Sequence, residues 1–257
     1  MMTARVFAAG GGIGVLGGMV GLGGAEFRLP LLIAVFGFAA LHAVILNKAM
    51  SLVVVVTALP VRLFAVPFAE AGARWDVLVT LLPGSVAGAW LGATWATRMR
   101  AALLYRVLAI LLVVIAGVLL ATHFGSLEPF ALLPAARTVA GVAAGVAIGV
   151  VAALMGVAGG ELLIPTIVLL FGADIKLAGS LSLAVSLPTM LVAFVRYSRD
   201  RSFAVLRENG RFVAVMAAGS IAGTVLGGLL LGAVPDGVLI PLLAALLLLS
   251  AAKVWRH

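Results

Sequence analysis

Long apolar stretches joined by short polar connections make up almost the whole chain. A helix needs about 20 residues to cross the roughly 30 Å hydrocarbon core of a bilayer, and most of these stretches are about that long. The longer stretches cover residues 6–25, 43–64, 77–97, 103–122, 138–157, 180–195, 212–232 and 238–254, and two shorter ones cover 29–40 and 162–171. The longest polar stretch is 196–211, which leaves no room for a soluble domain. The pattern therefore predicts an all-α polytopic membrane protein whose function lies within the bilayer.

Composition narrows the chemistry that this protein can perform. Hydrophobic residues make up 64% of the chain and charged residues only 10%, far from the balance of a soluble domain. Cysteine is absent, which excludes disulfides and thiolate metal sites, and the three histidines show no metal-ligand spacing. Basic loops at a membrane surface explain the net charge of +8, so nucleic acid is not an expected partner. We predict no metal and no cofactor.

One ten-residue motif occurs twice, 135 residues apart (Gly21 against Gly156), with a glutamate at the same position in each copy. Residues 21–30 read Gly-Leu-Gly-Gly-Ala-Glu-Phe-Arg-Leu-Pro, and residues 156–165 read Gly-Val-Ala-Gly-Gly-Glu-Leu-Leu-Ile-Pro. The same offset pairs Gly10 with Gly145, Phe36 with Phe171, Ser51 with Ser186, Ser85 with Ser220 and Leu91 with Leu226. An ungapped register over this span indicates duplication of one ancestral unit. We predict two membrane repeats, residues 1–125 and 126–257, of about five helical elements each.

The relative orientation of the two repeats depends on whether each crosses the membrane an odd or an even number of times. The basic loop of the first repeat, at Arg98 and Arg100, follows its fourth element, whereas that of the second, 196–211, follows its third. Cytoplasmic loops carry an excess of Lys and Arg, so this switch between equivalent loops is what opposite orientation predicts. We therefore predict inverted repeats with both termini in the cytoplasm. Whether the short segments after Glu26 and Glu161 cross the membrane or are re-entrant stays open.

Each copy of the motif predicts a broken or re-entrant helix. Glycine tolerates an irregular backbone and proline fits a first helical turn, so we expect new helices to start near Pro30 and Pro165. Backbone N–H groups at such a helix start form a ready anion site in a low-dielectric interior. The glycines at these starts are Gly23, Gly24, Gly159 and Gly160. The motif therefore predicts an anionic substrate.

The two glutamates complicate an anion site. A carboxylate repels an anion unless a cation neutralises it or it binds a proton, and apolar burial favours the protonated form. Arg28 is expected to supply the cation for Glu26, but its counterpart in the second copy is Leu163. We therefore predict that both glutamates take part in proton coupling, Glu161 more than Glu26. The alternative is that each glutamate only caps the start of its helix.

Small polar residues at helical spacing follow each motif. Asn47 and Ser51 lie four residues apart and share one face of a helix, and Ser182 and Ser186 take the same positions in the second repeat. Such hydroxyl and amide groups can bind an oxyanion, or they can join helices by hydrogen bonds. For Lys48, the sequence leaves open both the inner membrane surface and the lining of an entrance.

Glycines spaced four residues apart predict close packing of two further helices. They are Gly84, Gly88 and Gly92 in the first repeat and Gly219, Gly223 and Gly227 in the second. We expect these seams to be packing surfaces and not parts of the substrate site.

The chain resembles the TauE/SafE family of sulfite exporters at the two motifs and at the polar residues that follow them. The residues that carry the likeness are 21–30, 156–165, Asn47-Lys-Ala-Met-Ser51 and Ser182-Leu-Ala-Val-Ser186. The resemblance covers essentially the whole chain, and it implies transport of sulfur-containing anions such as sulfite and organosulfonates across the bacterial inner membrane. The family's usual Gly-Gly-Gly run is Gly23-Gly24-Ala25 and Ala158-Gly159-Gly160 here, and the glutamates that follow it are candidates for a subgroup preference.

Together these features predict a secondary transporter, not an enzyme, that moves a small sulfur-containing anion by alternating access of the two repeats. The anion is sulfite, thiosulfate or an organosulfonate, and proton coupling runs through Glu161 and Glu26. The residues expected to bind the anion are Gly23, Gly24, Glu26, Arg28, Asn47, Ser51, Gly159, Gly160, Glu161, Ser182 and Ser186. The expected partners are the small anion and the lipid bilayer, and a homodimer stays open. An intramembrane lipid-phosphate hydrolase and a passive anion channel are the alternatives.

Overall fold

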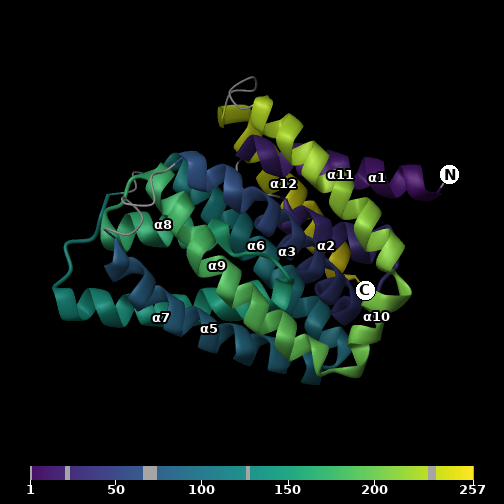
Figure 1. Ribbon diagram of the computed structural model, residues 1–257, viewed down its shortest axis with the longest axis horizontal. Coiled ribbons are helices and arrows are strands. Elements are labelled where there is room, and N and C mark those ends of the chain that lie inside the picture. The colour runs from purple at the N-terminus through teal and green to yellow at the C-terminus, as the bar shows by residue number, and fades with distance from the viewer. Residues whose placement is uncertain (1, 21–23, 66–73, 126–127, 231–235, 257) are drawn as a thin grey trace.

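The computed structural model describes residues 2–20, 24–65, 74–125, 128–230 and 236–256, and within these ranges the chain forms helices and their connections (Figure 1). The first six helices are α1 (Met2–Val20), α2 (Ala25–Ala34), α3 (Ala40–Ala65), α5 (Trp75–Arg98), α6 (Ala101–Phe124) and α7 (Pro134–Met155). The others are α8 (Gly160–Phe171), α9 (Ile175–Ser198), the short 3-10 helix η1 (Arg201–Phe203), α10 (Ala204–Glu208), α11 (Gly210–Leu229) and α12 (Asp236–Trp255). The prediction of an all-α chain is confirmed.

The length and composition of the helices fit a membrane. Among the described residues, six helices are long and apolar enough to cross a bilayer, namely α3, α5, α6, α7, α9 and α11. Helix α8 and the stretch Leu239–Trp255 of α12 are shorter apolar helices. Large apolar side chains also face outward, as a lipid-facing surface requires, for example those of Trp75, Leu103, Val139, Leu229 and Leu249. The chain is therefore a polytopic membrane protein.

The order of the helices recurs along the chain. Helix α2 begins at Ala25 and α8 at Gly160, and the starts of α3 and α9, of α5 and α11, and of α6 and α12 are separated by the same 135 residues. The two sets of helices are interlocked, because α1 packs on α11 and α7 packs on the equivalent α5 (Figure 1). The division at residue 125 and the opposite orientation of the two repeats stay predictions.

Glycine seams allow these two helix pairs to approach closely. A Cβ atom on Gly88 of α5 would clash with the backbone of Val146 in α7, and one on Gly223 of α11 would clash with the backbone of Gly11 in α1. Only glycine leaves room for main chains at this separation, which is the usual role of small residues between membrane helices. The prediction that the seams are packing surfaces is confirmed.

A glycine in a left-handed conformation precedes α2 and α8 in the two repeats. Helix α1 ends at Val20 before α2, and α7 ends at Met155 before α8. The residues that precede α2 and α8, Gly24 and Gly159, have φ values of 69° and 86°, which favour glycine. The prediction of broken helices is confirmed for the second copy, whereas residues 21–23, including Gly23, lie outside the described residues.

The position of the prolines corrects one expectation. Pro30 and Pro165 lie in the second turn of α2 and α8, so neither helix starts at its proline. The left-handed glycine starts each helix earlier, and the fixed φ of proline fits the helix that follows. Because proline has no N–H, the main-chain carbonyls of Glu26 and Glu161, four residues earlier, lack their usual helical donor.

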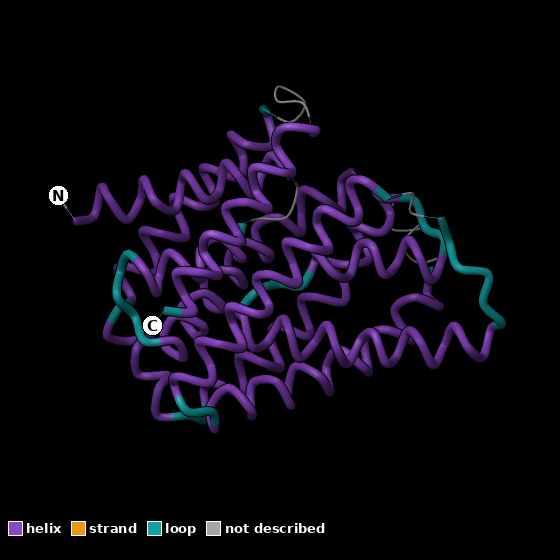
Figure 2. The backbone as a smooth tube through the Cα atoms, turned by 180° about the vertical axis from the view of Figure 1, so that it is seen from behind, coloured by secondary structure: helices purple, strands orange, loops and turns teal. Residues whose placement is uncertain are grey.

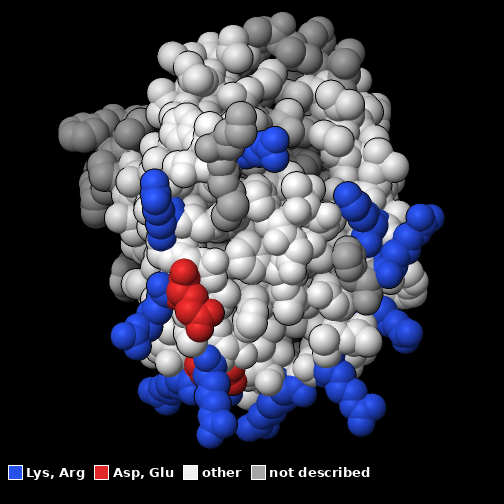
Figure 3. Space-filling model, turned by 90° about the vertical axis from the view of Figure 1, so that its right-hand side faces the viewer, with Lys and Arg blue, Asp and Glu red and all other residues white. Residues whose placement is uncertain are grey.

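The described chain ends and many basic side chains lie at one end of the molecule. Both ends of the chain lie on the same side as α10, as the views from the front and from behind agree (Figures 1 and 2). Viewed from that side, the surface carries many Lys and Arg side chains and few Asp or Glu (Figure 3). The connection from α9 to α11 contributes exposed basic residues, namely Arg199, Arg201 and Arg207.

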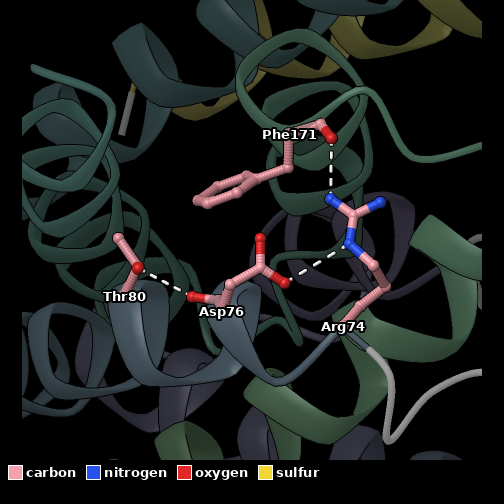
Figure 4. Close-up of polar contacts among 4 residues, drawn as sticks. All are labelled: Arg74, Asp76, Thr80 and Phe171. Atoms are coloured by element: carbon pink, nitrogen blue, oxygen red, sulfur yellow. Dashed lines mark hydrogen bonds and ion pairs between the residues drawn. The ribbon is translucent and has the colours of Figure 1, made fainter. Parts of the chain in front are cut away.

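An arginine before α5 joins the two repeats at the C-terminus of α8 (Figure 4). Arg74 Nη2 donates to the main-chain oxygen of Phe171 at 2.7 Å, and its Nε donates to Asp76 Oδ1 at 3.3 Å. Thr80 Oγ1 donates to the main-chain oxygen of Asp76 at 2.7 Å. A cation at a helix C-terminus satisfies a free carbonyl and stabilises the helix dipole. This contact therefore holds the start of α5 against α8.

Candidate functional site

A buried arginine from α2 is surrounded by polar residues of α3. Arg28 is fully buried, its Nε donates to Asn47 Oδ1 at 2.8 Å, and its Nη2 donates to Ser51 Oγ at 2.8 Å. Asn47 and Ser51 lie one helical turn apart, so the prediction that they share a face is confirmed. The structure thus brings together Arg28, Asn47 and Ser51 of the predicted site.

The second repeat contributes a residue that the sequence analysis did not assign to the site. Arg28 Nη1 donates to Ser220 Oγ at 3.1 Å. Ser220 is buried on α11, next to Gly219 of the packing seam. The signal that could have identified it is the recurrence of a serine, Ser85, at the equivalent position of the first repeat.

Arg28 and Glu26 influence each other electrostatically, but they do not form a direct ion pair among the described residues. Within the described ranges no ion pair joins Arg28 to a carboxylate, and the ion pair that is present joins Arg74 to Asp76 at 3.3 Å. The reason is geometric, because residues two apart on a helix point about 200° apart around its axis. Arg28 faces α3 and α11, whereas Glu26 faces α6 and α12. Among the described residues, all the hydrogen-bond partners of the guanidinium are therefore neutral.

The two glutamates meet on the other side of α2. Glu26 and Glu161 are the second residues of α2 and α8, and both line one cavity of about 10 Å³. The other residues that line it are Phe27, Ile115, Leu119, Leu243 and Leu247. The two carboxyl groups lie close enough to interact electrostatically. One glutamate from each predicted repeat thus contributes to the same cavity.

Neither carboxyl group belongs to the N-cap residue of its helix. Both oxygens of Glu26 and Oε2 of Glu161 are buried and have no hydrogen-bond partner among the residues that the structure describes. The N-cap positions of α2 and α8 are glycines, Gly24 and Gly159, which offer no side-chain acceptor. A buried polar atom without a partner is costly and calls for an explanation beyond local structure.

Lys48 lies neither at the membrane surface nor in the lining of an entrance, so both alternatives are wrong. It is fully buried, and its Nζ donates to the main-chain oxygens of Ala152 at 2.8 Å and Val157 at 2.7 Å. Asn47 Nδ2 donates to the oxygen of Met155 at 3.0 Å in the same region. Ala152 and Met155 belong to the last turn of α7 and Val157 follows it directly, so the cation lies where the helix dipole stabilises it. Helix α3 therefore holds the broken helix of the second repeat.

The predicted residues of the second repeat form a different arrangement. Ser182 Oγ donates to the main-chain oxygen of Gly179 in its own helix at 2.8 Å, and Ser186 Oγ is buried without a hydrogen-bond partner in the described chain. Leu163, which takes the position of Arg28, offers Ser186 no donor. The polar site is thus asymmetric, and Ser182 and Ser186 are not brought into contact with Arg28.

The described glycines of the motif shape the helix starts. Gly24 and Gly159 occupy the turn before α2 and α8, and Gly160 is the first residue of α8. Asn47 Nδ2 also donates to the main-chain oxygen of Ala25 at 3.0 Å, which places the start of α2 beside the partners of Arg28. The positive end of the α2 dipole therefore adds to the charge of the guanidinium.

Comparison with known proteins gives one family. A family model described as "Sulfite exporter TauE/SafE" matches residues 6–254, which includes both copies of the motif. No curated protein and no solved structure matches the chain.

Proposed function

The chain belongs to the sulfite exporter TauE/SafE family of membrane transporters for sulfite-type anions, and we propose that it is a secondary transporter that works by alternating access. Its substrate is a small sulfur-containing anion, for which sulfite, thiosulfate and organosulfonates are the candidates. The site is formed by Arg28 with Asn47, Ser51 and Ser220. Gly24 at the start of α2 completes it.

One observation supports this proposal most directly, namely a buried guanidinium that has no counter-ion among the residues that the structure describes. Three of the five N–H donors of Arg28 are engaged by neutral oxygens, and the other two have no acceptor in the described chain. A buried charge is costly unless it is paired, and charged residues inside a membrane usually serve a substrate pathway. Arginine also matches the geometry of oxyanions better than any other side chain. A bound anion would therefore supply the missing charge.

The closed state of the site favours a carrier over a passive channel. Arg28, Asn47 and Ser51 are at most 2% exposed, so the site is closed to both sides in this conformation. An anion can reach Arg28 only when helices move, which is a feature of alternating access. Arg28 on α2 contacts both α3 and α11, so a movement of α2 away from either helix would open the site.

The basic end of the molecule supports an orientation in the bacterial inner membrane. The end that carries the described chain termini and α10 is rich in Lys and Arg (Figure 3). Positive charge favours the cytoplasmic side of a membrane. We therefore propose that both termini are cytoplasmic.

The first test removes the guanidinium. In the variant Arg28→Gln, we expect binding of sulfite to weaken at least about tenfold, because a charge-assisted oxyanion contact contributes about 1.5–3 kcal/mol. Arg28→Lys keeps the charge but not the planar fork, and its affinity should fall between those of Arg28→Gln and the wild type. Binding is measured by ligand-dependent thermal stability in detergent, and transport by uptake of radiolabelled sulfite into liposomes.

The matched control is Arg106→Gln, which removes an exposed arginine from α6. It should leave sulfite binding unchanged. Thiosulfate, sulfate and sulfoacetate in the same assay then rank the candidate substrates. Sulfite binding by Arg28→Gln equal to that of the wild type would contradict the proposed site. Hydrolysis of a phosphate ester without binding of any of these anions would favour the lipid-phosphate hydrolase instead.

A further inference from the structure

The cavity between the two glutamates is separate from the arginine site. Arg28 faces α3 and α11, while the carboxyl groups of Glu26 and Glu161 face apolar side chains of α6 and α12. The apolar side chains of these two helices at the cavity are Ile115, Leu119, Leu243 and Leu247. Whatever occupies the cavity is therefore held by the two carboxyl groups.

These carboxyl groups lack the partners that two carboxylates would need. Glu26 is 1% exposed and Glu161 8%, and three of their four oxygens are buried without a hydrogen-bond partner in the described chain. Two negative charges that line one small apolar cavity repel each other strongly. One proton removes one charge and turns one carboxyl group into a hydrogen-bond donor for the other.

The surrounding charges do not replace that proton. Arg28, on the same helix, is bound to Asn47, Ser51 and Ser220, and Lys48 on α3 is bound to two carbonyls at the end of α7. Both cations act on the carboxyl groups at a distance, and neither forms an ion pair with them among the described residues. The side chains of α6 and α12 at the cavity are apolar.

The dimensions of the cavity favour a proton over a metal cation. A volume of about 10 Å³ holds about one water molecule. A hard metal cation takes about six or more oxygen ligands, and the two carboxyl groups, within apolar walls, supply at most four. A proton needs only the two carboxyl groups, with one water at most between them.

We propose that Glu26 and Glu161 form a carboxyl pair that binds one shared proton when the starts of α2 and α8 are together. When the two helix starts separate, water enters, the proton leaves to that water, and both groups become carboxylates. The closed state then forms again only after a proton is taken up. The geometry of the cavity is sufficient to support binding of the proton. The role of the proton as the coupling ion rests on the proposed transport function.

The first experiment tests the proton without transport. Infrared spectra of the purified protein, recorded as the pH is raised, follow the C=O stretch of protonated carboxyl groups. The pH at which this band disappears should be higher in the wild type than in Glu26→Gln or Glu161→Gln, by about one unit or more. Each variant removes the carboxyl group that shares the proton. Glu128→Gln, which changes an exposed glutamate, should behave as the wild type.

Two infrared results would overturn the proposal. One is a shift of the band in only one of the two glutamine variants while the other behaves as the wild type, since the two groups would then titrate independently. The other is the absence of any protonated carboxyl band in the wild type at neutral pH. Glutamine has nearly the shape of glutamate, and the thermal stability of each variant shows whether it is folded.

The second experiment tests the coupling. Liposomes with a pH-sensitive dye inside report the number of protons moved for each radiolabelled sulfite transported. This ratio should fall at least about tenfold in both glutamine variants and stay unchanged in Glu128→Gln. A ratio that depends on sodium in place of protons would contradict the proposal. If the wild type does not transport sulfite, the proposed function fails, while the infrared result still decides whether the pair holds a proton.

Discussion

At the scale of the residue, comparison of the two repeats shows how one substitution changes a site. The equivalent serines Ser51 and Ser186 are both buried on equivalent helices. Ser51 accepts a hydrogen bond from Arg28, whereas Ser186 has no partner in the described chain because Leu163 stands at the equivalent position. The duplicated unit therefore carries a charged site in the first repeat and an uncharged counterpart in the second.

This difference gives a matched pair of variants. Ser51→Ala should lower the free energy of unfolding by about 1.5–3 kcal/mol, because it leaves a buried guanidinium donor unpaired. Ser186→Ala removes a hydroxyl that has no partner and should leave the stability unchanged or slightly higher. Unfolding of both variants in the same detergent is the measurement. Equal losses would show that the hydrogen bond to Arg28 contributes nothing.

Residue patterns predicted which side chains gather, but not the directions in which all of them point. The four-residue spacing of Asn47 and Ser51 was sufficient to place both on one face. Arg28 and Glu26 are close in sequence, but they form no direct ion pair because residues two apart on α2 point to opposite sides of the helix. Ser220 was missed because the recurrence of Ser85 and Ser220 lies within the glycine seams. A serine beside packing glycines can serve either packing or the site.

At the scale of the element, the glycine seams decide which helices pack together. Their spacing predicted close packing, but not the partner helix, because a seam shows only that some main chain approaches. The structure pairs α5 with α7 and α1 with α11, so each pair contains one helix from each predicted repeat. The glycine breaks were also predictable, while the exact helix starts were not, because proline tolerates more than one early position.

A second matched pair tests the seam. Gly88→Ala places a Cβ atom against the backbone of Val146, so α5 and α7 must separate, and we expect a loss of about 1–3 kcal/mol. Gly228→Ala on α11 meets no atom within 4 Å, and the higher helix propensity of alanine should raise stability by about 0.5–1 kcal/mol. Thermal unfolding in detergent gives both values. Tolerance of Gly88→Ala without loss would contradict the observed packing.

At the scale of the whole molecule, the distribution of charge predicts the topology. Reporter domains fused after Arg100 and after Arg207 should both be active in the cytoplasm, because each follows a basic segment. A reporter inserted after Glu128, in the connection between α6 and α7, should be active on the opposite side. Compartment-dependent reporter activity in whole cells is the measurement. If the reporters after Arg100 and Arg207 lie on opposite sides, the inverted arrangement is wrong.

The interlocking of α1 with α11 has a consequence for biosynthesis. The seam residue Gly14 of α1 meets the main chain of Ser220, Gly223 and Thr224 in α11, more than 200 residues later in the chain. At about 5–20 residues per second, the ribosome completes α11 roughly 10–40 s after α1 has left it. During that time the partner of the glycine face of α1 has not yet been synthesised. Insertion and assembly are thus separate events for this protein, and a stall in translation after α6 would leave in the membrane an intermediate with an open seam.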